Sequence, residues 1–328
     1  MPDDRLLYLY LNEVSMLYGS ISNIGDHVSR LVLGTGSFAP ERLDDIRPVF
    51  QAFLAAGGTT FDTAHVYGRG ASERALGELI RERGGTDGLV IVDKGAHPSL
   101  DDWLPRVTPE ALLQDLEESL DRLGITTIDL YLLHRDDPTV PVGPLVECLS
   151  NQVVAGRIRA FGGSNWTPSR IDAANAYAAA HGLPGFVASS PQFSLAFPTK
   201  VAAPGGVSLG GDHVALEWYR RNGLAILCWS SQAKGYFALP EEAAPGDVPD
   251  RLRPFDTPAN RERRDRAREL ARRHRCTPTQ IALAWHLHQP IKAFPIVGTG
   301  RQSHLEDCLG ALEVPLTAEE VGWLEQVD

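Results

Sequence analysis

The sequence predicts a single (β/α)₈ barrel across residues 1–328, with a short hairpin at its N-terminus, from three observations. Eight short apolar segments alternate with amphipathic stretches, and most are continuously apolar, as parallel strands covered on both faces are. Threonine-proline pairs at 108–109, 167–168 and 277–278 mark helix starts. Polar residues or glycines follow directly after each predicted strand. A barrel collects all eight strand ends on one face, whereas an open doubly wound sheet spreads them along a line, so the barrel is favoured.

The elements follow in chain order. The predicted strands are Ser29–Leu33, Thr59–Phe61, Leu89–Val92, Thr127–Leu133, Ile158–Gly162, Gly185–Ser189, Ala225–Cys228 and Ala293–Ile296. Helices are predicted over 44–56, 71–83, 144–155 and 215–222, and from each of the three Thr-Pro pairs. Residues 1–26 do not fit a βα unit and predict a hairpin that closes the barrel bottom, with its turn near 22–25. The long βα loops 96–107, 193–212 and 233–260 are expected at the active-site face.

Composition excludes several classes of function. The formal net charge is −11, and the one dense basic run, 261–275, is interleaved with acidic residues and predicts a solvated helix face. Nucleic-acid and anionic-membrane partners are therefore not expected. The start of the chain lacks a signal-peptide pattern, no segment has the length of a membrane span, and the four cysteines form no CxxC pair. We expect a cytoplasmic protein with reduced thiols and no metal.

Four residues at successive strand ends form a candidate catalytic set. Asp62 ends the second strand, Tyr67 follows five residues later, and Lys94 and His134 end the next two strands. Neighbouring strands lie about 5 Å apart, so these groups can meet. An ammonium beside a tyrosine lowers the phenol pKa from about 10, and a paired carboxylate keeps that ammonium charged. With His134 as hydrogen-bond donor, the set suits proton donation to a carbonyl oxygen, and a hydride source must complete the reaction.

The run Asp62-Thr-Ala-His-Val-Tyr67-Gly resembles the aldo-keto reductases. Lys94 and His134 continue the resemblance, as do Gly163-Ser-Asn, Gln192, Trp229-Ser and Phe294-Pro-Ile-Val-Gly from about residue 28 to 312. The resemblance implies a barrel that binds an extended nicotinamide dinucleotide without a Rossmann domain. It also implies that Tyr67 is the general acid, tuned by Asp62, Lys94 and His134.

The same resemblance implies cofactor contacts. They are Ser164, Asn165 and Gln192 to the carboxamide; Trp229 on the nicotinamide ring; Ser230, Gln232, Lys234 and Gly235 to the pyrophosphate; and Gly298, Thr299, Arg301, His304, Asp307 and Cys308 at the adenosine end. Independently of the resemblance, Gly34 and Thr35 are expected to contact the cofactor, because glycine lets the backbone approach a ligand closely. Arg301 suits a 2′-phosphate, so NADP(H) is preferred over NAD(H). The chain departs from the family pattern at Cys308, where most members have asparagine, at Asp93, where threonine is common, and at 232–234.

The predicted reaction interconverts an aldehyde or ketone, including sugar-like ones, with an alcohol. Expected substrate contacts are Trp103, Arg135, Trp166 and Phe197, which could equally form a hydrophobic rim on loops. Two other classes stay open. One is a cofactor-sensing regulatory protein like the potassium-channel β subunits. The other is a non-redox barrel enzyme that uses Lys94 as a Schiff-base amine.

Overall fold

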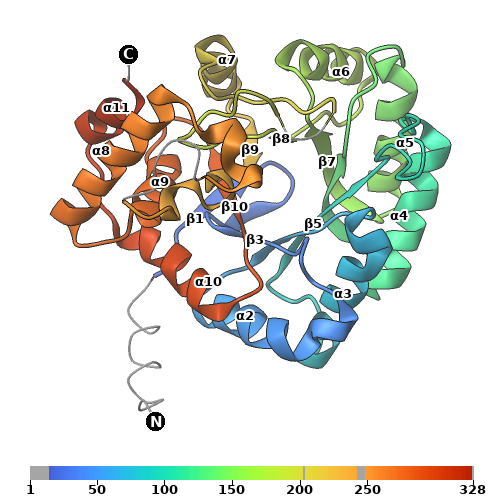
Figure 1. Cartoon of the computed structure of the whole chain (residues 1–328). Coiled ribbons are helices and arrows are strands. Elements are labelled where there is room, and N and C mark those ends of the chain that lie inside the picture. The colour runs from blue at the N-terminus through green and yellow to red at the C-terminus, as the bar shows by residue number, and fades with distance from the viewer. Residues whose placement is uncertain (1–14, 202–203, 242–247, 327–328) are drawn as a thin grey trace.

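Eight parallel strands close a barrel in the computed structural model, which describes residues 15–201, 204–241 and 248–326 (Figure 1). The strand order around the barrel is β10-β3-β4-β5-β6-β7-β8-β9, so each neighbour in sequence is a neighbour in space. The predicted fold class is confirmed. The strands are β3 Val32–Gly34, β4 Thr60–Asp62, β5 Val90–Gly95, β6 Ile128–Leu133, β7 Ile158–Ser164, β8 Ala188–Ser190, β9 Ala225–Cys228 and β10 Ala293–Gly298.

An antiparallel hairpin closes the barrel bottom, as predicted for this end of the chain. Strand β1 (Tyr18–Ile21) pairs with β2 (Gly25–Ser29), and the turn occupies residues 22–24. Ile21 and Val28 pack with Phe294 in the barrel interior. Ser29 belongs to this hairpin, which is why the first barrel strand begins three residues later than predicted. Residues 1–14 of the predicted hairpin segment lie outside the described residues.

Helices surround the barrel (Figure 1). They are α2 Leu43–Ala55, α3 Ala71–Arg83, α4 Pro109–Leu123, α5 Val142–Val154, α6 Pro168–His181, α7 His213–Asn222, α8 Pro258–His274, α9 Pro278–Leu287, α10 Gln302–Leu309 and α11 Ala318–Glu325. Short 3₁₀ helices are η1 Pro40–Arg42, η2 Tyr67–Gly70, η3 Ala233–Ala238, η4 Asp250–Phe255 and η5 Gly310–Glu313. The side chains of Thr108, Thr167 and Thr277 each accept a hydrogen bond from the backbone N–H three residues on. The three Thr-Pro starts are therefore N-caps, as the sequence indicates. No helix in the described ranges has the length and apolar character needed to cross a membrane.

Strand alternation divides the core into two parts and aims the site residues. Val90, Val92, Leu130 and Leu132 face the barrel interior, whereas the residues between them face the helices. Two residues beyond Val92 and Leu132 come Lys94 and His134. On β5 and β6, the series of side chains that face the barrel interior therefore leads to Lys94 and His134, the polar residues that the sequence predicts for the site.

Helix α8 corrects the interpretation of the basic run as a solvated face. Arg263, Arg264 and Arg268 are only 6%, 5% and 8% exposed. The Arg263 guanidinium lies 4.0 Å from the Phe197 ring centroid, and Arg268 donates to the carbonyls of Leu239 and Pro240. Because long arginine side chains cover apolar surface with their stems, this helix face packs against the loops after β8 and β9. The helix begins at Pro258, inside the predicted loop 233–260, and the described part of that loop carries η3 and η4.

Candidate functional site

A buried ion pair anchors the site between two neighbouring strands. The Lys94 Nζ donates to Asp62 Oδ2 at 2.6 Å and to the Thr63 carbonyl at 2.7 Å. The Lys94 and Asp62 side chains are 3% and 4% exposed. Burial opposes charge on Lys94, but attraction to Asp62 and Tyr67 outweighs it and raises the lysine pKa. Burial also raises the pKa of Asp62, and the ammonium opposes that rise. The contacts on both sides of the pair indicate that Lys94 stays an ammonium.

Tyr67 stands over this pair. It opens η2, its N–H bonds to the Ala64 carbonyl at 2.9 Å, and Gly68 and Arg69 after it are left-handed. This tight turn returns the phenol ring to the strand ends, where Lys94 Nζ lies 5.3 Å from the ring centroid. Burial raises the pKa of Tyr67, and Lys94 pulls it back only in part. The sequence predicted the direction of the lysine effect, but it could not weigh that effect against burial.

His134 completes the group from β6. Its ring centroid lies 5.7 Å from that of Tyr67 and 4.7 Å from that of His97. Burial, reinforced by the charges of Lys94 and Arg135, holds the pKa of His134 well below its usual range. The imidazole is therefore neutral and carries one N–H. Its Nδ1 is buried without a partner among the described residues.

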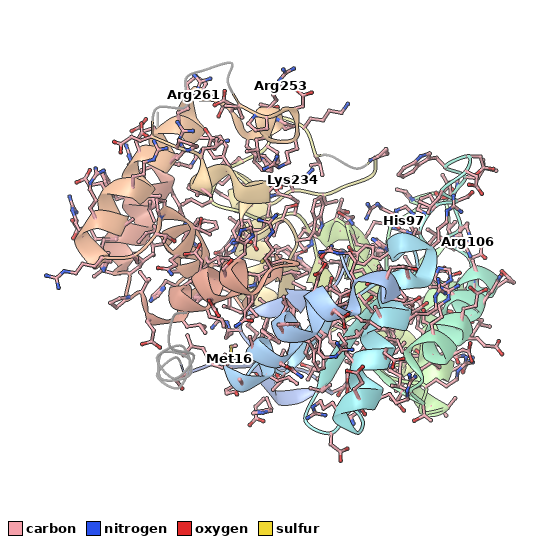
Figure 2. All side chains as sticks on the ribbon, turned by 60° about the horizontal axis from the view of Figure 1, so that its bottom comes forward. Met16, His97, Arg106, Lys234, Arg253 and Arg261 are labelled. Carbon is pink, nitrogen blue, oxygen red and sulfur yellow. The ribbon has the colours of Figure 1, made fainter. Side chains whose placement is uncertain are left out.

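A cavity of about 520 Å³ opens over these four residues. It is lined by Gly36, Asp62, Val66, Tyr67, Gly68, Lys94, His97, Leu100, Trp103, His134, Arg135, Ser164, Asn165, Trp229 and Ser230. The labelled His97 and Lys234 lie toward the same end of the molecule, away from Met16 near the hairpin (Figure 2). The cavity thus lies at the carboxyl ends of the strands, where barrel enzymes carry out their chemistry.

A sequence model described as the Aldo/keto reductase family matches residues 30–328. This chain belongs to the aldo/keto reductase family. It is an NAD(P)H-dependent oxidoreductase, in agreement with the resemblance carried by its motifs.

Two sequence relatives and one solved structure share between 22% and 28% of aligned residues with this chain. It is 28% identical to an aldo-keto reductase of Strobilurus tenacellus, over 88% of this chain and 82% of that one. It is 24% identical to the versiconal hemiacetal acetate reductase of Aspergillus parasiticus, over 95% of this chain and 96% of that one. A solved aldo-keto reductase from Klebsiella pneumoniae, in complex with NADPH, has a TM-score of 0.70 at 22% identity and covers 94% of each chain. The last likeness shows that the fold is shared.

Three of the four residues expected at the nicotinamide end, Ser164, Asn165 and Trp229, form one hydrogen-bonded group in the cavity that Tyr67 also lines. Asn165 donates to the His134 carbonyl at 3.3 Å and accepts from the Trp229 indole N–H at 3.2 Å. Both line the cavity, as do Ser164 and Ser230. Asn165 and Ser230 have left-handed backbones, with φ of 60° and 52°. Such strain in residues other than glycine is typical of loops that face a ligand. This donor set fits an aldo/keto reductase cofactor.

Of the expected cofactor residues, only Ser164, Asn165, Trp229 and Ser230 line the cavity, and Gln192, Thr35 and Gly34 are among those that do not. Gln192 is 1% exposed, and its amide is already bonded to the hydroxyls of Ser194 and Ser208. Thr35 points away from the interior, where its hydroxyl bonds to the Asp62 carbonyl at 3.0 Å. Gly34 packs against β10, since an added Cβ would lie 2.8 Å from Ile296. Gly36, the next residue on the interior side, lines the cavity instead.

The expected pyrophosphate and adenosine contacts are spread over η3, the end of β10 and α10. Gly235 and Gly298 have open space where a Cβ would stand, and Lys234, Arg301 and His304 are exposed. Thr299 Oγ1 donates to the Arg301 carbonyl and accepts from its N–H, which shapes the turn. Asp307 accepts from Thr277 at 2.8 Å and thereby ties α10 to α9. Cys308 is 2% exposed and accepts from Gln232 Nε2 at 3.1 Å.

The four expected substrate contacts divide into two pairs. Trp103 and Arg135 line the cavity. Trp166 is 0% exposed in the hydrophobic core, and its indole N–H donates to the Arg135 carbonyl at 3.2 Å. Phe197 packs under Arg263. The last two therefore do not line the cavity: Trp166 packs in the core, and the partly buried Phe197 ring lies against Arg263 of α8. The sequence analysis assigned no role to Val66, His97 and Leu100, which also line the cavity, although the predicted active-site loop 96–107 includes the last two.

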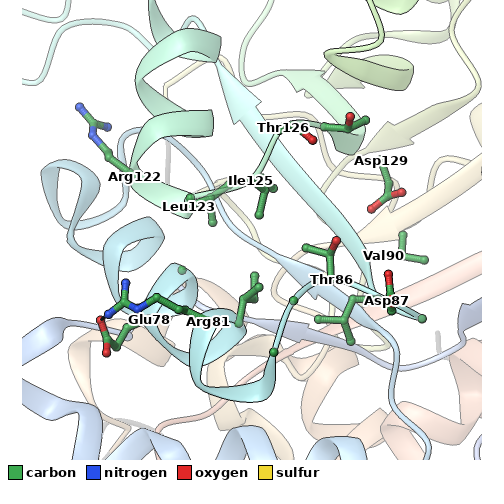
Figure 3. Close-up of a pocket in the computed structure, with 18 of the residues that line it drawn as sticks. Glu78, Arg81, Thr86, Asp87, Val90, Arg122, Leu123, Ile125, Thr126 and Asp129 are labelled. Carbon is green, nitrogen blue, oxygen red and sulfur yellow. Dashed lines mark hydrogen bonds and ion pairs between the residues drawn. The ribbon is translucent and has the colours of Figure 1, made fainter.

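A larger hollow, of about 1170 Å³, lies far from this chemistry. It runs between the ends of α3 and α4 and the starts of β5 and β6, where Glu78, Arg81, Asp87, Arg122 and Asp129 are seen (Figure 3). Arg122 pairs with Glu73 and Glu118, and Asp129 bonds to the Ile91 N–H. This hollow carries charges of both signs and lies at the amino ends of the strands, where barrel enzymes do not place their active sites. We therefore assign the function to the smaller cavity.

Proposed function

We propose that this chain interconverts an aldehyde or ketone and an alcohol with NADP(H), using Tyr67 as general acid and base. The observation that carries the proposal is that Tyr67, the Lys94–Asp62 pair and neutral His134 line one cavity together with Ser164, Asn165 and Trp229. The nicotinamide would supply a hydride to the carbonyl carbon.

The protein's own groups manage the proton and the developing charge. Tyr67, kept protonated by its raised pKa, donates its proton to the carbonyl oxygen in reduction. The Lys94 ammonium stabilises the resulting phenolate, and Asp62 keeps Lys94 in place. His134 donates its single N–H to the substrate oxygen, which fixes the carbonyl next to the phenol. For oxidation of the alcohol the same proton path runs in reverse.

A Schiff-base role for Lys94 is disfavoured by the same contacts. Nucleophilic amines must lose their proton, and the partners of Lys94 raise its pKa instead. A purely regulatory role predicts tight cofactor binding with negligible turnover, which the experiment below separates from catalysis.

NADP(H) is preferred because an exposed cation, Arg301, lies on the segment expected to contact the adenosine end of the cofactor. Arg301 immediately precedes α10. A guanidinium binds a 2′-phosphate well, and the Klebsiella pneumoniae relative was solved with NADPH. Titration with NADPH and NADH, followed by tryptophan fluorescence, should show tighter binding of NADPH. Arg301→Ala should reduce that preference about 10-fold or more, whereas unchanged discrimination would contradict the assignment.

Tyr67→Phe tests the catalytic role. We expect turnover to fall about 10²- to 10⁴-fold while the Kd for NADPH changes less than about twofold. Tyr177→Phe is the matched control, since Tyr177 bonds to Glu147 on the outer helices and lies outside the cavity. Equal loss of turnover and cofactor affinity in Tyr67→Phe would contradict the proposal, and so would full activity. Tight NADPH binding without any turnover by the unmodified protein would favour the regulatory role.

A further inference from the structure

One buried guanidinium in the cavity has no acidic partner. Arg135 is 8% exposed, and the described residues include no carboxylate that forms an ion pair with it. The carboxylates that follow it in sequence are engaged elsewhere: Asp136 pairs with Arg170 at 2.9 Å, and Asp137 accepts from Thr139. Since a buried charge is costly unless it is paired, this arrangement points to an anion that comes from outside the chain.

The donors that remain on Arg135 define the shape of that anion. Its Nη1 donates to the His134 carbonyl at 2.8 Å, and its Nε is buried without a partner among the described residues. The side of the guanidinium formed by Nε and Nη2 therefore has no hydrogen-bond acceptor among the described residues. Two parallel N–H donors match the two oxygens of one carboxylate.

The backbone around Arg135 is fixed. The Trp166 indole holds the Arg135 carbonyl at 3.2 Å, and Asn165 holds the His134 carbonyl at 3.3 Å. These contacts orient Arg135 with respect to His134, which lies against the Tyr67 ring. An anion bound by Arg135 therefore lies close to the reacting carbonyl.

The charge and polarity of the cavity lining agree with this arrangement. Its charged side chains are Asp62, Lys94 and Arg135, and the first two neutralise each other. One positive charge is left over in a chain whose formal net charge is −11. Beside it, Leu100 and Trp103 offer apolar surface for the body of a substrate.

We propose that Arg135 binds the carboxylate of the substrate, so that the physiological substrate is a small oxo acid, an aldehyde or ketone that carries a carboxylate. This inference rests on the proposed function. The carboxylate itself is unchanged in the reaction: a hydride from the reduced nicotinamide goes to the carbonyl carbon, and the Tyr67 proton goes to the carbonyl oxygen.

The experiment compares para-carboxybenzaldehyde with its neutral methyl ester. With NADPH, we expect kcat/KM for the acid to exceed that for the ester about 10-fold or more. Arg135→Met should lower kcat/KM for the acid about 10- to 100-fold, mainly through KM, and leave the ester within about threefold. Arg135→Lys should recover the acid only in part, because an ammonium lacks the planar fork. Arg69→Met is the control, because this substitution removes the same charge from an exposed arginine that does not line the cavity.

Several outcomes would overturn the inference. They are an ester that is reduced as well as the acid, an equal loss of both substrates in Arg135→Met, and a change in NADPH affinity that accounts for the loss. A second test uses the unmodified protein. Competitive inhibition of ester reduction by benzoate would support the site, and the absence of inhibition would overturn it. Ester reduction without preference for the acid leaves the proposed function standing, whereas no reduction of either aldehyde together with no NADPH binding would overturn both.

Discussion

Removing the Lys94 ammonium should destabilise the protein by more than most single substitutions. In Lys94→Met the side chain keeps its length, but Asp62, 4% exposed, loses its partner at 2.6 Å. Breaking a buried pair from one side costs about 3–5 kcal/mol, because an uncompensated charge is left in the interior. The Thr63 carbonyl loses a donor at 2.7 Å as well, which adds about 1 kcal/mol. We expect a total loss of about 4–6 kcal/mol in the free energy of unfolding.

The assay is a double-mutant cycle by urea unfolding. Asp62→Asn alone removes the opposite charge and should also destabilise the protein, whereas Lys94→Met combined with Asp62→Asn leaves no buried charge at the pair. Residues in one buried network are not additive, so the double variant should be more stable than the sum of the two single losses, by about 2 kcal/mol or more. All three variants should lack turnover, so stability is the informative readout.

Two results would refute this reasoning. One is a loss below about 1 kcal/mol in Lys94→Met, which is the range of an exposed pair. The other is a cycle that closes within about 0.5 kcal/mol, which would mean that the two groups do not interact. Either would remove the ion pair as the reason that Lys94 stays charged.

Other predictions follow from the buried groups around the site. Because reduction needs the Tyr67 phenol and burial raises its pKa, kcat for reduction should stay flat through neutral pH and fall at alkaline pH, whereas oxidation should speed up there; a profile that is the same in both directions would contradict the role. Burial and the nearby Glu73 raise the pKa of Asp93 well above its ordinary 3.8 in the folded protein. The folded protein therefore binds this proton more tightly than the unfolded chain does, and the free energy of unfolding falls as pH rises above 3.8. Asp93→Asn should therefore gain stability over the unmodified chain as pH rises from 4 to 8, and a constant difference in urea midpoint would count against this. Gly95→Ala should cost about 3 kcal/mol or more, because its Cβ would stand 1.9 Å from the Tyr131 hydroxyl; Tyr131→Phe in the same chain should recover part of the loss in thermal unfolding.

Local sequence pattern accounts for much of the fold and for the tetrad. Continuous apolar runs predict strands covered on both faces, and each Thr-Pro pair predicts an N-cap that the structure contains. Asp62, Lys94 and His134 were predicted together because strand ends of a barrel share one face, a consequence of topology that needs no side-chain detail.

Facing and burial were decided by the tertiary structure. Thr35 and Gly36 are neighbours in sequence, yet only the glycine faces the cavity. Which of the two faces inward depends on where β3 begins after the hairpin, because successive residues of a strand point to opposite sides. Trp103 and Trp166 are both loop tryptophans by pattern, yet one lines the cavity and the other lies in the core.

The same holds for charge. Alternating signs predict a solvated face for α8, whereas Arg263 lies against Phe197 from a loop about sixty residues earlier in the chain. For Tyr67 the sequence supplies the neighbouring ammonium, but desolvation sets the net pKa. The sequence by itself determined the elements and the chemical groups at their ends, because these depend on local spacing. Only the packed structure determined which groups lose water and which keep a partner, because both depend on atoms contributed by distant segments.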